Sequence, residues 1–152
     1  MSEDGISEAD RLAADVGAAM YANDKAAQAL GIRLEHVGEG RADMSMLVRD
    51  DMVNGHDVCH GGLTFTLADT AMAYASNSYN QVALAQTASI QFTAPGRRGE
   101  RLTAVAREAF GEGRTGIYDI AVTGEDGRTI ALFRGSTRKV RGRIVGTEEE
   151  AS

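Results

Sequence analysis

The sequence has 152 residues, of which 43% are hydrophobic and 25% are charged, so it is long enough to bury most of its apolar surface in one core. Its formal net charge at pH 7 is −6, which disfavours a nucleic-acid partner because phosphate backbones are bound by basic surfaces. We therefore expect a single globular domain over 1–152 that does not bind nucleic acid.

Targeting features point to the cytoplasm. The opening residues, MSEDGISEAD, lack the basic region and the long apolar region of a secretion signal. The apolar stretch at 63–75 is too short and too interrupted to span a bilayer. A single cysteine, Cys59, excludes an internal disulfide framework and is typical of a reducing compartment. These features predict a cytoplasmic protein without a membrane partner.

The N-terminal part is predicted to be helical over about 7–30. Ser7 is a suitable N-cap for a first helix. An apolar stripe at helical spacing runs through Leu12, Val16 and Met20. The helix is interrupted at Asn23-Asp24, and a second short helix, KAAQAL, ends at Gly31, a residue type that favours the position just after a helix.

Two strands and a buried helix are predicted next. The period of the apolar residues changes to two over 32–37 and 41–48, and Gly-Glu-Gly at 38–40 joins these strands as a hairpin. A loop over 50–60 then leads into 61–79. This last segment contains no Lys, Arg or Glu and is therefore predicted to be a largely buried helix.

Four more strands, separated by glycine-rich turns, are predicted after this helix. They occupy 82–94, 101–110, 115–124 and 128–140. An acidic tail is expected at about 146–152. The order of elements predicts an α+β protein in which an antiparallel sheet wraps around a long central helix, the hotdog architecture. The edges of such a sheet are often protected by pairing with a second copy.

The predicted central helix carries one charged residue, Asp69, on a stripe of small polar residues. This stripe comprises Thr66, Asp69, Thr70, Ser76 and Asn77. A solvated helix face normally carries several Lys or Glu residues, so the pattern indicates a cleft. In a cleft, Asp69 is a candidate general base or nucleophile whose pKa is raised by desolvation. The alternatives are a structural carboxylate with satisfied hydrogen bonds and a stripe that faces bulk water.

Gly61 and Gly62 lie where the central helix is predicted to begin. At such a position, unpaired backbone N–H groups and the positive end of the helix dipole can stabilise a developing oxyanion. The alternative interpretation is that the two glycines only form a tight turn into the helix. Gly61 and Asp69 are eight residues apart, about 12 Å along the axis, so one carbonyl does not reach both within a chain. If both act on one substrate atom, they come from different chains of a symmetric dimer with two shared sites.

The loop before the helix carries further polar side chains. Asn54 either forms a turn with Gly55 or holds a water or a carbonyl through its amide. His56, Cys59 and His60 are candidate zinc ligands, but a structural site usually needs four ligands and no second Cys/His pair exists, so no metal is expected. A Cys59 nucleophile with a His60 base is a further alternative, beside a small buried cysteine.

Arginines are the candidate ligands of phosphate groups. Arg97 and Arg98 follow Pro95-Gly96 in a predicted turn, and the segment 134–143 adds basic side chains to an otherwise acidic chain. Most of them are explained as solvated surface charges. Some are expected to bind the phosphates of a nucleotide-bearing substrate.

The sequence resembles the PaaI-type hotdog thioesterases of phenylacetic acid degradation. This resemblance is carried mainly by NGHDVCHGGLTFTLADTAMAYASNS at 54–78. It is supported by MYANDKAAQALGI at 20–32, GIYDI at 116–120 and IALFRG at 130–135, so it covers nearly all of the chain except its ends. The long central motif is specific, and the shorter segments only support it.

The resemblance implies an acyl-CoA thioesterase without a cofactor, which hydrolyses phenylacetyl-CoA or ring-hydroxylated phenylacetyl-CoA in the phenylacetate degradation pathway. It also implies homodimers with shared active sites that pair into a homotetramer. In the family, the residue matching Asp69 is the nucleophile or the general base, and the glycine matching Gly61 polarises the thioester carbonyl. The family asparagine and histidine match Asn54 and His60, which orient water or substrate.

The resemblance also suggests substrate contacts. The residues assigned to substrate binding are Gly62, Thr70, Tyr74, Asn77, Arg97 and Arg98. Tyr74 and Asn77 are expected along the acyl pocket. Ala94 departs from the family pattern, in which a basic residue often precedes the proline, so Arg97 or Arg98 is expected to take over its contact with CoA.

Two other functions remain open at this point. A hotdog enoyl-CoA hydratase would use His60 and Asp69 as an acid/base pair. A non-catalytic acyl-CoA-binding protein would use the same cleft without turnover.

Overall fold

The helices and strands follow one another in the predicted order. The computed structural model describes residues 5–146. Its elements are α1 (Glu8–Asn23), α2 (Lys25–Ala29), β1 (Arg33–Gly38), β2 (Arg41–Leu47), the 3-10 helix η1 (Asp50–Met52), α3 (Gly61–Asn77), β3 (Ala83–Phe92), β4 (Arg101–Glu112), β5 (Thr115–Thr123) and β6 (Thr129–Lys139). The predicted loop over 50–60 thus contains a short 3-10 helix that the sequence did not indicate.

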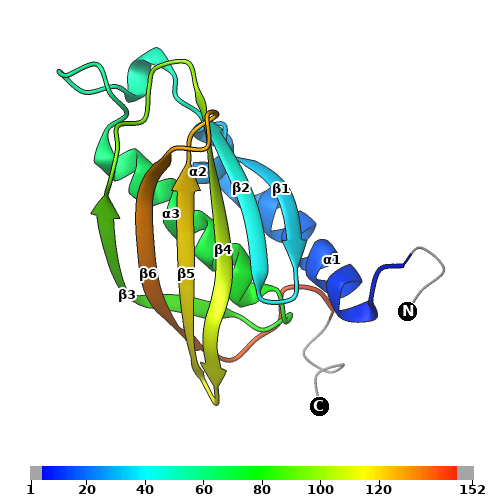
Figure 1. Cartoon of the computed structure of the whole chain (residues 1–152). Coiled ribbons are helices and arrows are strands. Elements are labelled where there is room, and N and C mark those ends of the chain that lie inside the picture. Colours follow the sequence, from blue (N-terminus) through cyan, green and yellow to red (C-terminus); the bar gives the residue numbers. More distant parts are fainter. Residues whose placement is uncertain (1–4, 147–152) are drawn as a thin grey trace.

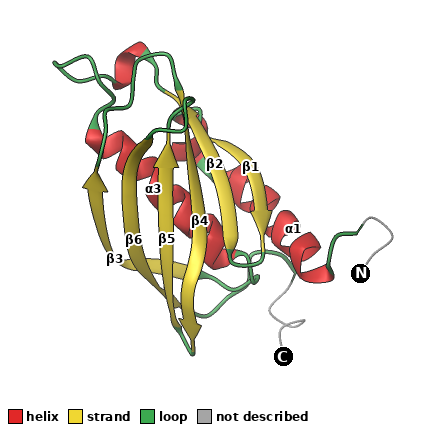
Figure 2. Ribbon diagram, in the orientation of Figure 1, coloured by secondary structure: helices red, strands yellow, loops and turns green. Residues whose placement is uncertain are grey.

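The strands form one antiparallel sheet in the order β1-β2-β4-β5-β6-β3. The sheet wraps around α3, which crosses behind the strands in Figure 1, while α1 lies beside β1. Figure 2 shows the same separation into a strand layer and a helix layer. The predicted α+β class and hotdog architecture are confirmed.

One face of α3 forms the centre of the core. Its buried apolar residues are Leu67, Ala68, Ala71, Met72, Tyr74 and Ala75. Burial of a large apolar side chain contributes about 1.5–3 kcal/mol, so this contact accounts for much of the stability of the fold. On β6, a Cβ at Gly135 would overlap Met72 Sδ, so glycine at this position lets the helix lie close to the sheet. The sheet therefore fixes which face of α3 is buried and which is left open.

The N-cap predicted for the first helix is present, and the second helix has a cap that was not predicted. Ser7 Oγ accepts the Asp10 N–H at 3.1 Å at the start of α1. Asp24 ends α1 and then accepts the Ala27 N–H at 3.1 Å at the start of α2. Gly31 has φ +68°, which suits glycine after a helix. The predicted break and the second helix are confirmed.

The apolar stripe of α1 differs from the predicted one. Leu12 is 38% exposed, and the buried residues of the helix are Ala13, Val16 and Gly17. A Cβ at Gly17 would lie 2.8 Å from Val37 Cγ2 on β1. The helix therefore approaches the strand through small residues, which turns Leu12 away from the sheet.

The two edge strands of the sheet differ in what packs beside them. Along β3, Ala83 is buried and the other residues are exposed or half-buried. β3 pairs with β6 on one side, and among residues 5–146 no strand lies on its other side. The opposite edge, β1, has α1 packed beside it. β3 therefore presents unpaired backbone groups that are suited to adding a strand from a second copy.

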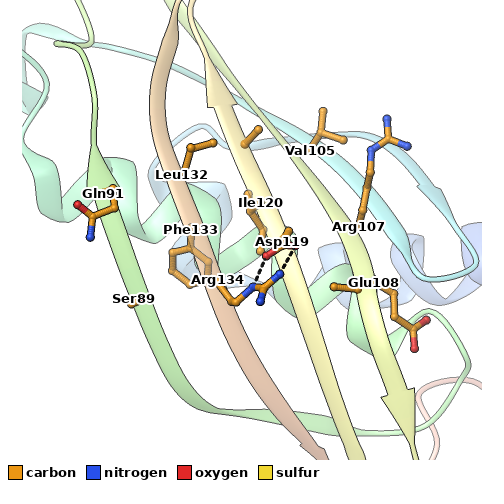
Figure 3. Close-up of a pocket in the computed structure, with 12 residues that line it drawn as sticks. Ser89, Gln91, Val105, Arg107, Glu108, Asp119, Ile120, Leu132, Phe133 and Arg134 are labelled. Carbon is orange, nitrogen blue, oxygen red and sulfur yellow. Dashed lines mark hydrogen bonds and ion pairs between the residues drawn. The ribbon is translucent and has the colours of Figure 1, made fainter.

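The sheet face away from α3 carries an apolar row next to a charged pair. Val105, Ala121 and Leu132 are register neighbours on β4, β5 and β6, and Leu132 is 50% exposed. Asp119 accepts two hydrogen bonds from Arg134, at 2.6 and 2.7 Å. These side chains border a hollow of about 710 Å³, shown in Figure 3. The face opposite α3 is therefore partly apolar and partly ion-paired.

The ends of the chain leave two expectations unresolved. The acidic tail predicted at about 146–152 lies, apart from Gly146, outside the described residues, and the extent of the domain over 1–152 stays a prediction.

Across residues 5–146, no helix combines the length and the apolar character needed to cross a membrane.

Candidate active site

The N-terminus of α3 is organised by His60. The imidazole Nδ1 accepts the Gly62 N–H at 2.9 Å, and the His60 carbonyl accepts from Leu63 at 2.9 Å and from Thr64 at 3.3 Å. The first four N–H groups of a helix lack i→i−4 partners, and here they belong to His60, Gly61, Gly62 and Leu63. His60 accepts from Gly62 and Leu63, and its own N–H donates to the Met52 carbonyl at 2.8 Å. The remaining N–H belongs to Gly61, and the described part of the chain offers it no acceptor. One backbone donor at the positive end of the helix dipole is therefore open to a ligand.

This cap corrects the expectation for Gly62. Its N–H is already bound to His60 Nδ1, so the backbone of Gly62 has no donor left for a substrate. Because Nδ1 accepts a hydrogen bond, the neutral imidazole carries its proton on Nε2. His60 is exposed, so this proton is available to water or to a substrate.

A hollow of about 380 Å³ opens beside the Gly61 N–H. It is lined by Val58, Cys59, Gly61, Thr64, Phe92, Thr93, Ala94, Pro95, Gly96 and Ile130. A Cβ at Gly61 would lie 3.1 Å from Phe92 Cζ, so glycine allows the ring to rest against the helix terminus. Phe92 lies 31 residues further along the chain, on the edge strand, and no local pattern in the sequence pointed to it. The donor is thus flanked by an apolar ring that the sequence analysis missed.

Asp69 lies midway along α3, on the face that the sheet leaves uncovered. Its side chain is half-buried, and within residues 5–146 it has neither a hydrogen-bond partner nor an ion-pair partner. Burial raises the pKa of the Asp69 carboxyl above its ordinary value. Holding a carboxylate in this way costs free energy, and such groups concentrate at functional sites. These properties match those expected of a general base or a nucleophile.

The two threonines beside Asp69 donate to the helix backbone instead of to the carboxylate. Thr66 Oγ1 donates to the Gly62 carbonyl at 2.8 Å, and Thr70 Oγ1 donates to the Thr66 carbonyl at 2.6 Å. Both hydroxyls keep lone pairs but have used their protons. In this arrangement Thr70 accepts hydrogen bonds from a substrate or a water, and Asp69 stays free to accept a proton.

Asn54 uses one half of its amide to close its own loop. Its Oδ1 accepts the His56 N–H at 2.9 Å and the Val58 N–H at 3.4 Å. The loop is also closed by the Asn54 N–H, which donates to the Val58 carbonyl at 2.9 Å. No acceptor for Asn54 Nδ2 lies within the described residues, so its two N–H groups remain available to a ligand. The turn and the ligand-binding interpretations of Asn54 are therefore compatible.

The metal and cysteine alternatives find no support. Across residues 5–146, no group of three or more His, Cys, Asp or Glu side chains is placed to hold a metal ion. Cys59 is buried, accepts from Thr64 Oγ1 at 3.6 Å, and its pKa is raised chiefly by burial. A nucleophilic cysteine needs a lowered pKa, and the candidate base His60 is bound to Gly62. Cys59 is a small buried side chain beside the hollow.

Tyr74 and Asn77, which were expected along the acyl pocket, are buried and bonded to other parts of the protein. Tyr74 is 0% exposed, and its hydroxyl donates to Asp24 Oδ2 at 3.1 Å. Asn77 is buried: its Nδ2 donates to the Ala83 carbonyl and its Oδ1 accepts the Ala83 N–H, both at 3.1 Å. Ser76, on the same predicted stripe, is buried as well. These side chains fix the end of α3 to α2 and to β3, so the open part of the stripe ends before Tyr74.

The two candidate phosphate ligands differ in their partners. Arg97 Nη1 lies 3.6 Å from Asp126 Oδ2, and both side chains are largely exposed. Arg98 contacts two carboxylates, those of Asp57 and Asp50. Arg97 is therefore the freer of the two guanidinium groups.

The open donor and the free carboxylate are far apart within one chain. Gly61 begins α3 and Asp69 lies eight residues further on, about 12 Å along the axis. The structure thus keeps the separation that led to the expectation of a site shared between two chains.

Comparison with known proteins identifies the family. A model of the thioesterase superfamily matches residues 56–131. Together with the similarities given below, this match shows that the chain belongs to the thioesterase superfamily.

Relatives of similar sequence match over most of the chain. The acyl-coenzyme A thioesterase PaaI of Escherichia coli (strain K12) is 46% identical over 128 residues, which cover 84% of this chain and 91% of that protein. A putative esterase of Archaeoglobus fulgidus is 39% identical over 121 residues, covering 80% and 79%.

Solved structures agree with this. The PaaI protein from the phenylacetic acid degradation operon of E. coli superposes with a TM-score of 0.88 at 43% identity, covering 90% of this chain and 99% of that one. A variant of the phenylacetic acid degradation protein PaaI from Thermus thermophilus has a TM-score of 0.74 at 34% identity, covering 77% and 100%. The predicted family, enzyme class and fold are confirmed.

Proposed function

We propose that this chain is an acyl-CoA thioesterase that hydrolyses phenylacetyl-CoA or ring-hydroxylated phenylacetyl-CoA to the free acid and CoA. The observation that carries the proposal is the pair of unsatisfied groups on α3, the open Gly61 N–H and the half-buried Asp69 without a partner among residues 5–146. The name of the E. coli relative supports the acyl-CoA class, and the names of the PaaI structures support the phenylacetate pathway.

In the proposed mechanism, Gly61 and Asp69 supply the electrophilic and the nucleophilic side of the reaction. The Gly61 N–H and the helix dipole stabilise the oxyanion that forms on the thioester oxygen. Asp69 either takes a proton from a water that attacks the carbonyl carbon, or attacks this carbon itself to form a mixed anhydride that water then cleaves. The C–S bond breaks, and CoA leaves as a thiolate that is then protonated from solvent.

The two routes are separated by isotope labelling. After one turnover in water that carries heavy oxygen, the anhydride route leaves label in the Asp69 carboxylate when water cleaves the anhydride at the carboxyl carbon of Asp69. Mass spectrometry of the peptide that contains Asp69 detects this label. Label in Asp69 therefore supports the anhydride route, whereas its absence is expected both for the general-base route and for an anhydride that water cleaves at the acyl carbon.

We propose that the site is shared between the subunits of a homodimer. The separation of Gly61 from Asp69 and the unpaired edge of β3 both support pairing with a second copy. Mixing Asp69→Asn and Asn54→Ala subunits tests this arrangement. A shared site gives one intact site in each mixed dimer, so about a quarter of the wild-type activity returns from two inactive variants. A site contained in one chain gives no recovery.

We also propose that two dimers pair into a homotetramer through the sheet face opposite α3. The apolar row of Val105, Ala121 and Leu132, together with the pair formed by Asp119 and Arg134, supports this surface (Figure 3). Light scattering tests the proposal: Leu132→Glu is expected to give active dimers, whereas an unchanged mass would move the interface elsewhere.

The other site residues have supporting roles in this proposal. Asn54 Nδ2 donates to the attacking water or to the thioester oxygen, and His60 positions the helix terminus while its Nε2–H faces the substrate side. Thr70 accepts a hydrogen bond beside Asp69, and Arg97 contacts a CoA phosphate. The named acyl-CoA thioesterase among the relatives favours hydrolysis over a hydratase with an acid/base pair of His60 and Asp69.

No cofactor is proposed beyond the CoA that enters as part of the substrate, and a cytoplasmic location is retained from the sequence. The deciding experiment measures free thiol released from a panel of aryl-acyl and alkyl-acyl CoA thioesters, with wild type beside Asp69→Asn. Turnover that prefers phenylacetyl compounds and disappears in the variant supports the proposal. Tight binding of acyl-CoA without turnover would replace it with a binding protein.

A further inference from the structure

We propose that Arg98 is a positioning residue for the loop that carries Asn54, and not a ligand of the CoA phosphates. The proposal rests on the proposed thioesterase function, because it assigns Arg98 a place in the same site. It concerns the loop over 53–59, which is closed by a bridge between Val53 and Cys59.

The guanidinium of Arg98 joins two carboxylates that flank this loop. Arg98 Nε donates to Asp57 Oδ1 at 3.0 Å, and Nη2 donates to the same oxygen. Nη1 donates to Asp50 Oδ1 at 3.3 Å. Asp50 lies before the loop in η1 and Asp57 lies at its tip, so one side chain connects the tip of the loop to its base.

The conformation of Asp57 makes this contact specific. Asp57 has φ +63°, in the left-handed region that residues other than glycine seldom adopt. Its N–H donates to the Asn54 carbonyl at 3.0 Å, so the backbone of Asn54 and the side chain held by Arg98 are linked through one residue. The contact with Arg98 helps to hold Asp57 in this uncommon conformation.

Arg98 itself projects from a firmly anchored turn. The Arg97 N–H donates to Glu100 Oε2 at 3.0 Å, and buried Glu100 also accepts two hydrogen bonds from Arg128, at 2.8 and 3.0 Å. The Cys59 N–H donates to the Gly96 carbonyl at 2.8 Å, which ties the end of the loop to the same turn. The turn is therefore the fixed side of the contact, and the loop tip is the side that is positioned.

The consequence for chemistry lies in the amide of Asn54. Because Asn54 Oδ1 closes the loop through the His56 and Val58 N–H groups, the orientation of the loop sets the direction of the free Nδ2 donors. Each of the three guanidinium nitrogens of Arg98 already donates to a carboxylate, so a phosphate would have to compete with Asp57 and Asp50 for these donors. Arg98 therefore acts through Asn54 and not on the CoA phosphates.

The test compares two substrates that share an acyl group. Phenylacetyl-CoA carries phosphates, and the phenylacetyl thioester of N-acetylcysteamine carries none. Arg98→Gln is expected to lower kcat about 10-fold to 100-fold on both substrates, with KM little changed, because a small misplacement of a positioning group costs this much. A rise in KM for the CoA substrate alone, with the truncated substrate unaffected, would overturn the proposal and make Arg98 a phosphate ligand.

A second variant approaches the same contact from the loop. Asp57→Asn keeps a residue type that tolerates positive φ but removes the charge that binds Arg98. It is expected to reproduce the loss in kcat, and the double variant is expected to be no worse than either single variant, since all three break one contact. If Arg98 bound phosphate, Asp57→Asn would instead leave kcat unchanged and lower KM for phenylacetyl-CoA. Multiplied losses in the double variant would also overturn the proposal.

The matched control is Arg41→Gln. Arg41 forms a comparable pair with Asp43 on β2, with two hydrogen bonds at 3.0 Å, and it lies on the sheet, away from the loop. Its loss is expected to leave the kinetics on both substrates unchanged.

A readout without catalysis separates this proposal from the proposed function. Hydrogen exchange of the backbone amides over 54–58 is expected to be faster in Arg98→Gln and in Asp57→Asn than in wild type and in Arg41→Gln. Unchanged exchange refutes the positioning role even if the enzyme is active. Absence of thioester turnover by wild type would refute the proposed function, and with it the catalytic significance of the loop.

Discussion

The two halves of α3 carry similar polar residues and use them in opposite ways. In the first half, the Gly61 N–H and the Asp69 carboxylate have no partner within the described residues. In the second half, the hydroxyl of Tyr74 binds Asp24 and the amide of Asn77 binds the backbone of Ala83. A polar residue on a helix therefore indicates chemistry only where the surrounding fold leaves it unsatisfied.

This contrast has an energetic reason. A buried polar group without a partner costs about 1–3 kcal/mol, so a fold keeps such a group only where something else depends on it. The groups at Tyr74 and Asn77 recover that cost through hydrogen bonds to the protein. Asp69, which is half-buried, makes no such bond within residues 5–146, and this distinguishes the candidate reactive half of the helix from the structural half.

The sharpest test of the difference between the two halves of α3 is the substitution Asp69→Asn. The substitution is expected to lower kcat about 10²-fold to 10⁴-fold, the range for loss of a general base, without loss of the fold. Thiol release from phenylacetyl-CoA measures the activity, and thermal unfolding measures the stability. Because burial raises the pKa of Asp69, the folded state favours the neutral side chain, and the variant is expected to be at least as stable as wild type at neutral pH. A fully active variant would remove Asp69 from the mechanism.

The pH dependence of wild type examines the same carboxylate without a mutation. Only the ionised form accepts a proton or attacks the thioester, so kcat is expected to fall about tenfold per pH unit below the pKa of Asp69. Since burial raises this pKa above 3.8, the fall begins at a higher pH than for an ordinary aspartate.

The effect of Asp69 on stability has the opposite sign. An acid whose pKa is raised on folding stabilises the folded state below its unfolded-state pKa, and this contribution is lost as the pH rises through the folded-state pKa. Activity and this part of the stability therefore change in opposite directions with pH. A kcat profile that stays flat through the acid range would contradict the role of Asp69.

Asn77→Ala examines the structural half of α3. The change removes two hydrogen bonds to the Ala83 backbone and leaves a buried N–H group and a buried carbonyl without a partner. The expected loss is about 1–3 kcal/mol in the free energy of unfolding, measured with urea, while kcat and KM per folded enzyme stay near wild type. A change in acyl preference at unchanged stability would return Asn77 to the acyl pocket.

Tyr74→Phe is expected to have the smallest effect. It removes one hydrogen bond, to Asp24 Oδ2, and keeps the packing of the ring. We expect a loss of about 1 kcal/mol in unfolding free energy with little change in kinetics. Wild-type stability combined with an altered KM for aryl-acyl substrates would show that the ring contacts the substrate.

Most of the fold was predictable because its signals are local. Alternation of apolar residues placed the strands, Ser7 marked the start of the first helix, Asn23-Asp24 marked its break, and Gly31 marked a helix end. These features depend on backbone geometry and on neighbouring residues, which the sequence states directly. Leu12 was misplaced because the close approach of Gly17 to Val37 depends on the packing of α1 against β1.

The candidate site was predictable only in part. Gly61, Asp69 and Asn54 could be proposed as candidates because helix position and residue type define what such groups offer. Tyr74 and Asn77 were also assigned to the acyl pocket because they lie further along the same helix. The position of a residue on a helix does not reveal whether other parts of the protein cover that residue. Phe92 was missed because β3 brings it to Gly61 from a distant part of the chain.

The sequence by itself determined the family, the order of the elements and the residues at the start of the central helix, because these depend on local pattern. Only the tertiary structure decided which polar groups remain unsatisfied. It showed that the N–H groups of His60, Gly62 and Leu63 are satisfied at the start of α3 while that of Gly61 is left open, and that the stripe is covered from Tyr74 onward. The physical reason is that hydrogen bonds and burial are made between segments far apart in the chain, and their completion or absence exists only after folding.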